Sequence, residues 1–163
     1  MMDRGRYFYA EKDDITYIKM VGNLKYTTSS GFDHFVDGLM ERGFKNVVID
    51  LSEASYIDST NLGLIAKIAG RARHNPNMHV SIVSPNEDIN EILHSVRFDK
   101  LFTIVEKMEG VEELEEIPDE QRDKKDDLQM LIKAHKALMD IDEENRPQFK
   151  DVVELLEKEV KDF

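Results

Sequence analysis

The sequence contains no cysteine. This absence excludes disulfide bonds, thiolate nucleophiles and cysteine-based zinc sites. It favours a reducing compartment, because disulfide-stabilised domains are typical of oxidising ones. No apolar run approaches the roughly 20 residues that a membrane-spanning helix needs, and the N-terminal segment lacks the apolar stretch of a signal peptide. We therefore expect a cytoplasmic protein that does not enter a membrane.

Basic residues are scarce relative to acidic ones. The 163 residues include 34 acidic and 22 basic side chains, which gives a formal net charge of −12. A chain this acidic is not expected to bind nucleic acid or an anionic membrane, because both require a basic surface. Residues 111–163 carry 18 acidic and 9 basic side chains, whereas residues 1–110 carry 16 and 13. The sequence thus predicts a nearly balanced core followed by an acidic C-terminal piece.

Familiar catalytic and cofactor motifs are missing as well. The histidines are scattered, and no pair has the spacing of a metal site on one helix face; they are His34, His74, His79, His94 and His135. The sequence has neither a glycine-rich phosphate-binding loop nor a dinucleotide-binding fingerprint. Acidic residues are abundant, but none form an apolar-flanked pair typical of acid–base catalysis. We therefore expect no enzyme, no metal site and no cofactor.

Short apolar segments alternate with amphipathic ones along residues 7–105. The β-branched and aromatic segments predict five strands; these are residues 7–10, 15–21, 46–51, 79–83 and 103–105. Apolar residues at helical spacing predict helices; these cover residues 32–40, where Gly43 is the expected stop, 64–74 and about 85–93, with Pro85 in the first turn. This order predicts an α/β fold, in which helices flank a mixed sheet of about five strands with a parallel centre.

The acidic C-terminal piece is predicted to form two further helices. The first is expected over residues 119–140, and the second begins near Asn145, whose spacing to Gln148 fits a capping box. A short link between them suits an antiparallel helical hairpin. Neither helix can bury its apolar stripe alone. The hairpin could therefore brace the core or dock a partner, and the sequence leaves both open.

One stretch is a candidate for chemistry. Asp58, Ser59 and Thr60 lie where the chain passes from an apolar strand to a helical pattern. Such residues favour helix starts, because their side-chain oxygens accept hydrogen bonds from unpaired backbone N–H groups. The simplest interpretation is a helix cap without chemistry. The alternative is a hydroxyl placed for modification.

Four segments together resemble a known family. The segments are residues 18–24, which end in Gly-x-Leu; residues 46–52, an apolar strand; residues 56–63, Tyr-Ile-Asp-Ser-Thr-Asn-Leu-Gly; and residues 93–102, which end in Phe-Asp-Lys-Leu-Phe. In this order they resemble the STAS domain, the fold of bacterial anti-sigma factor antagonists, whose phosphorylation loop usually reads Asp-Ser-Ser/Thr-Gly-Leu-Gly. The resemblance implies a STAS domain over residues 1–115. It leaves residues 116–163 as a two-helix extension.

The resemblance implies control by phosphorylation. In this family the first serine after the aspartate is phosphorylated by a partner serine kinase. That kinase is often also the anti-sigma factor and has an ATP-binding fold related to histidine kinases. Carried over, the acceptor is Ser59, with Thr60 as the alternative. The unphosphorylated protein binds the partner and frees a sigma factor, and a metal-dependent serine phosphatase reverses the modification. The implied partner-binding residues are Asp58, Ser59, Thr60, Asn61, Leu62, Gly63, Asn23 and Lys25.

Two departures from the family pattern affect this expectation. Asn61 replaces the usual glycine, which matters if the position requires a positive φ or close approach of a partner backbone. Lys25 stands where many relatives have an acidic residue. A non-switching STAS scaffold or ligand-sensing module is the competing hypothesis. In either case we expect a monomer or a weak dimer.

Overall fold

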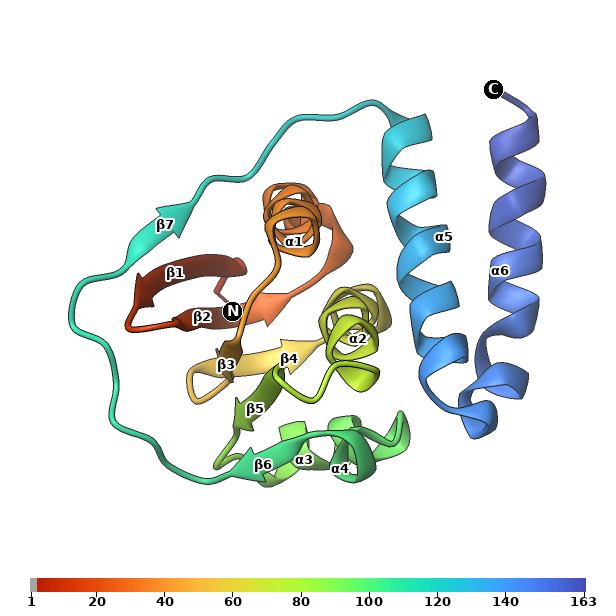
Figure 1. Ribbon diagram of the computed structural model, residues 1–163. Coiled ribbons are helices and arrows are strands. Elements are labelled where there is room, and N and C mark those ends of the chain that lie inside the picture. The colour runs from red at the N-terminus through yellow and green to blue at the C-terminus, as the bar shows by residue number, and fades with distance from the viewer. Residues whose placement is uncertain (1–2) are drawn as a thin grey trace.

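The core of the protein is a mixed sheet, seen in the computed structural model, which describes residues 3–163 (Figure 1). Within these residues the strand order is β6-β5-β3-β2-β1-β7, and β4 pairs with β2. The strands are β1 (Arg6–Lys12), β2 (Ile15–Leu24), β3 (Asn46–Asp50), β4 (Ala54–Ile57), β5 (His79–Val83), β6 (Thr103–Val105) and β7 (Glu115–Ile117). Strands β2, β3, β5 and β6 pair in parallel, while β1 is antiparallel to β2 and β7. The predicted mixed sheet with a parallel centre is confirmed.

Helices cover one face of this sheet in successive layers (Figure 1). They are α1 (Ser30–Arg42), α2 (Ser59–Arg73), α3 (Glu87–Ser95), α4 (Phe98–Leu101), α5 (Lys124–Ile141) and α6 (Arg146–Lys161), with 3₁₀ turns at Tyr26–Thr28 and Glu143–Asn145. Helices α1 and α2 lie next to the sheet, α5 packs outside them, and α6 is outermost. None of the helices within residues 3–163 combines the length and apolarity needed to cross a bilayer.

Side-chain alternation along the central strand divides the apolar residues between two faces. Val47 and Ile49 join the main core beneath α1 and α2, whereas Val48 points to the opposite face, as successive strand residues do. There Val48 packs with Tyr17 and Val83 under the segment that joins β6 to β7. The central strand is therefore buried on both sides, which explains its nearly continuous apolar sequence.

Several local predictions are confirmed, and others need correction. Gly43 ends α1 with a φ of 77°, as expected. Strands β4 and β7 were not expected; both are short, and they depend on pairing with β2 and β1. Helix α3 begins after Asn86, whose side chain accepts from the Asp88 and Ile89 N–H groups, so Pro85 precedes the helix.

The C-terminal hairpin forms, and its second helix begins next to Asn145 as predicted, but the start of the first helix changes. Helix α5 begins at Lys124 instead of residue 119, because the Asp123 carboxylate caps it by accepting from the Asp126 N–H at 2.8 Å. The predicted capping box at Asn145 is wrong. Its side-chain amide instead donates to the carbonyls of Val96, at 2.9 Å, and Leu138, at 3.0 Å. Asn145 thereby joins the hairpin turn to the core.

Candidate functional site

The site begins where β4 passes into α2. Asp58 is the N-cap of α2, and its Oδ1 accepts from the backbone N–H of Asn61 at 2.9 Å. Its Oδ2 accepts from the backbone N–H of Tyr26 at 2.7 Å. Both carboxylate oxygens thus fix the loop around the helix start, and Ser59 becomes the first residue of α2. The predicted helix cap is confirmed for Asp58.

Asn61, the departure from the usual glycine, turns its side chain into the core. Its backbone lies within α2 without a positive φ, and the residue is fully buried. Its Nδ2 donates to Asp58 Oδ1 at 2.9 Å, and its Oδ1 accepts from the Tyr7 hydroxyl at 2.5 Å and from Ser29 Oγ at 3.1 Å. Burial raises the pKa of Tyr7 to about 12, which keeps its hydroxyl a donor. A polar side chain is therefore satisfied where a glycine would leave space.

Ser59 forms a hydrogen bond with the C-terminal hairpin. Its Oγ lies 2.8 Å from Nε2 of His135 on α5. His135 is 4% exposed, and its Nδ1 lies 2.6 Å from the Leu131 carbonyl oxygen. Since a carbonyl only accepts, Nδ1 carries a hydrogen, and in the neutral ring Nε2 accepts from the Ser59 hydroxyl. The free N–H groups at the start of α2 favour an anion beside Ser59.

Further along α2, Gly63 lies directly against α5. A Cβ placed on Gly63 would overlap the Ala134 carbonyl and lie 2.6 Å from the Ala134 Cβ, so α5 approaches as closely as it does only because Gly63 has no side chain. Thr60 and Leu62 are buried beside Gly63, at 3% and 3% exposure. Of the predicted residues of α2, Ser59 and Gly63 therefore contact α5, whereas Asn61 turns toward β1 and the segment before α1.

The predicted residues outside α2 lie at the rim of the site. Asn23 pairs with Tyr56 between β2 and β4, and Lys25 is exposed at the end of β2. Tyr26, which follows Lys25 and bonds Asp58 through its backbone, is 44% exposed, and Tyr56 is 40% exposed. Two accessible aromatic rings thus border the start of α2. Sequence reasoning did not single them out.

His135 is the other residue that sequence reasoning missed. It lies 76 positions from Ser59, and its available signal was a polar ring in the apolar stripe of a predicted helix. Within residues 3–163, no three histidine, aspartate or glutamate side chains gather as metal ligands.

The comparisons with known proteins concern the sheet and its first helices. A model of the STAS domain matches residues 9–111, which is more than half of the chain. A crystal structure of an anti-sigma factor antagonist from Mycobacterium paratuberculosis superposes with a TM-score of 0.54 at 15% identity, covering 66% of this chain and 88% of that one. A candidate antagonist from Thermotoga maritima gives a TM-score of 0.53 at 25% identity, covering 61% and 86%.

A third similar structure is the antagonist SpoIIAA in its unphosphorylated form, with a TM-score of 0.52 at 10% identity, covering 63% of this chain and 89% of that one. These likenesses concern the fold. The matched family segment ends at residue 111, before β7 and the hairpin. The α5–α6 hairpin is therefore an addition to the shared domain.

Proposed function

Because this chain belongs to the STAS domain family, we propose that it is an anti-sigma factor antagonist controlled by phosphorylation of Ser59. The observation that supports this most is the place of Ser59: it is the first residue of a helix, directly after the Asp58 cap, within the segment that the family model matches. Ser59 is half-buried, whereas Thr60 is 3% exposed, which favours Ser59 over Thr60 as the acceptor.

Phosphorylation at this position would change binding more than folding. A phosphoserine carries about −1.5 to −2 charges at neutral pH. The N–H groups and dipole of α2 stabilise an anion at the helix start, so the fold tolerates the modification. A partner surface shaped for a neutral hydroxyl would instead meet a dianion beside the Asp58 carboxylate. The unphosphorylated form is therefore the one that binds.

The partner in this proposal is a bacterial anti-sigma factor that is also a serine kinase with a histidine-kinase-like ATPase fold. A metal-dependent serine phosphatase removes the phosphate, and the reactions take place in the cytoplasm, where ATP is available. The chain itself is a substrate and a binding partner and catalyses nothing. The exposed rings of Tyr26 and Tyr56, together with Lys25, supply an accessible rim that such a partner can contact.

Phosphate incorporation tests the acceptor. The full chain is incubated with the partner kinase and ATP, and the site is located by mass spectrometry. We expect one phosphate, which Ser59→Ala abolishes and Ser55→Ala retains; Ser55 is an exposed serine four residues earlier, so it controls for the substitution itself. A phosphate that persists in Ser59→Ala would disprove the assignment.

Partner binding separates a switch from a scaffold. Immobilised wild type, Ser59→Ala and Ser59→Asp are compared for retention of the anti-sigma factor. A switch loses its partner only in Ser59→Asp, because only this variant adds a charge. Equal retention by all three would instead favour a scaffold or ligand-sensing module.

A further inference from the structure

The α5–α6 hairpin lies on the surface that the proposed partner would need. Helix α5 bonds the acceptor through His135 and packs the Ala134 backbone against Gly63. Two of the implied partner-binding residues, Ser59 and Gly63, are in direct contact with α5. A protein partner and α5 cannot occupy this face of α2 together.

The fit between the two helices is specific at two points. Gly63 admits a helix only where that helix presents a small residue, which Ala134 provides. Next to it, Ser59 Oγ forms a hydrogen bond with His135 Nε2 at 2.8 Å. This face of α2 is therefore built to receive a helix that carries a small residue beside an acceptor. In this structure that helix comes from the same chain.

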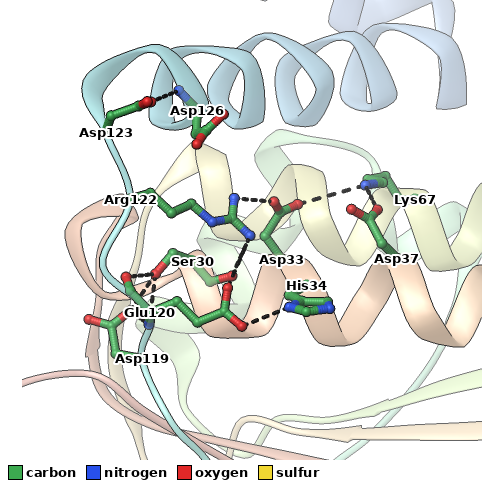
Figure 2. A network of polar contacts seen from close by, with 10 residues as sticks. All are labelled: Ser30, Asp33, His34, Asp37, Lys67, Asp119, Glu120, Arg122, Asp123 and Asp126. Atoms are coloured by element: carbon green, nitrogen blue, oxygen red, sulfur yellow. Dashed lines mark hydrogen bonds and ion pairs between the residues drawn. The ribbon is translucent and has the colours of Figure 1, made fainter.

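A set of polar contacts, called the latch below, holds the segment before α5 to the start of α1. Figure 2 shows Arg122, just before α5, reaching into the start of α1, where it bonds Asp33 Oδ2 at 2.7 Å and the Ser30 carbonyl at 2.9 Å. Asp33 is 6% exposed, and Lys67 lies 3.8 Å from its other oxygen. Ser30 also bonds Asp119 at 2.7 Å. The connector thus stays on α1 next to the site, and the hairpin has a high effective concentration at α2.

Opening of α5 would expose apolar side chains that lie in the main core, among them Met130, Leu138 and Ile141, so the covered arrangement dominates. By contrast, the α2 side offers little apolar area at Gly63, and a separated Ser59 and His135 would each regain hydrogen bonds to water.

We propose that the α5–α6 hairpin is a cover in cis for the Ser59 surface. It takes the place of a helix of the partner protein, and the partner or kinase reaches Ser59 only after α5 has moved away from α2. The hairpin would then set the threshold for partner binding. The identity of the excluded partner rests on the proposed function. The access to Ser59 that α5 leaves open can be measured without any partner.

Thiol reactivity measures the cover directly. Because the chain has no cysteine, Ser59→Cys creates a single thiol, whose rate of reaction with 5,5′-dithiobis(2-nitrobenzoic acid) reports access to position 59. The same rate is measured with Ala134→Glu added, which places a carboxylate against Gly63 without altering α2. Gln129→Glu is the matched control, because it adds the same residue at an exposed position of the same helix. Thr27→Cys, at an exposed position, gives the uncovered rate.

We expect the thiol of Ser59→Cys to react slowly compared with the thiol of Thr27→Cys. Ala134→Glu should raise the rate at position 59 by at least about tenfold, since a buried unpaired carboxylate disfavours the closed arrangement. Gln129→Glu should leave that rate within about twofold, as expected of an exposed substitution. Contact with His135 would increase the reactivity of the new thiol. Opening removes this contact, and its loss works against the expected increase in rate.

Hydrogen exchange of β2 and β3 amides shows whether the sheet stays folded. If Ala134→Glu unfolds the sheet, the same thiol measurement is made with the milder Ala134→Val. We then expect the reaction rate at position 59 to rise several-fold, because the larger side chain overpacks the contact at Gly63. The proposal would be overturned if the substitution at Ala134 left the reaction rate at position 59 unchanged. It would also be overturned if the thiol at position 59 reacted as fast as the thiol at position 27. A protected thiol in Ser59→Cys, together with a wild-type chain that no kinase phosphorylates, would retain the cover and reject the proposed function.

Discussion

Replacing Gly63 by alanine tests the packing of α5 on α2 with one methyl group. The new Cβ would lie 2.6 Å from the Ala134 Cβ, about 0.8 Å short of the 3.4 Å at which ordinary contact begins, and would overlap the Ala134 carbonyl. The Ala134 backbone cannot relieve the overlap by changing rotamer, as a flexible side chain can, so α5 must move outward. Overpacking of this kind costs about 1–3 kcal/mol, while alanine in place of glycine in a helix returns about 1 kcal/mol.

Gly70 provides the matched control within the same helix. A Cβ there would meet no other described atom within 4 Å, and the position is exposed. Gly70→Ala should therefore stabilise the protein by about 1 kcal/mol through helix propensity alone. Urea unfolding followed by far-UV circular dichroism gives both free energies of unfolding. We expect Gly63→Ala to be about 1–3 kcal/mol less stable than Gly70→Ala.

Amide exchange shows where the Gly63→Ala strain is relieved. The N–H groups of α5 and α6 should exchange faster in Gly63→Ala, while those of β2 and β3 keep their protection, because the helix that moves is the outer one. If Gly63→Ala gained as much stability as Gly70→Ala, with unchanged exchange in α5, the close approach at Gly63 would be refuted.

Three further predictions concern the groups that position the site. Since burial raises the pKa of Tyr7 from 10.0 to about 12, the folded state holds this proton more tightly than the unfolded state. The Tyr7 contribution is therefore complete below pH 10 and falls by about 1.4 kcal/mol per unit between pH 10 and 12; urea titrations should show a shallower alkaline loss in Tyr7→Phe. Asp58→Ala should lower the free energy of unfolding by about 1–2 kcal/mol by removing the α2 cap, and Asp58→Asn, which keeps an acceptor oxygen, by less; equal losses would argue against the cap. Arg122→Ala should cost about 3 kcal/mol, because the 6%-exposed Asp33 loses its closest cation, whereas Arg4→Ala, from an exposed pair, should cost less than about 1 kcal/mol. Equal costs for the two arginines in the same urea assay would show that the latch is no stronger than a surface pair.

The elements governed by neighbouring residues could be read from the sequence. Alternation and apolar runs located β3 and β5 and the body of α1, and Gly43 marked the end of α1. Asp58 was identified as a helix start, because a cap depends on hydrogen bonds to residues only three positions away. The order of these segments was enough for the fold class, since short connections and right-handed crossovers leave few arrangements open.

The sequence also marked Asn61 as unusual but could not explain it. Its side chain is satisfied by Tyr7 and Ser29, from β1 and the segment before α1, which the chain brings together only when the sheet forms. Likewise β7 is three residues long and has no pattern of its own; it is a strand because β1 offers a free edge. Such features depend on partners distant in sequence.

The sequence alone was therefore enough to identify the family and the helix start at Asp58, and it proposes Ser59 as the acceptor. Whether the C-terminal helices brace the core or wait for a partner was left open, because an amphipathic stripe specifies that a helix must be covered but not by what. The tertiary structure shows them covering α2 of the same chain: Gly63 admits the backbone of α5, and Ser59 bonds His135 across 76 positions. Both contacts depend on shape and on hydrogen-bond geometry between distant segments, which become neighbours only in the folded chain.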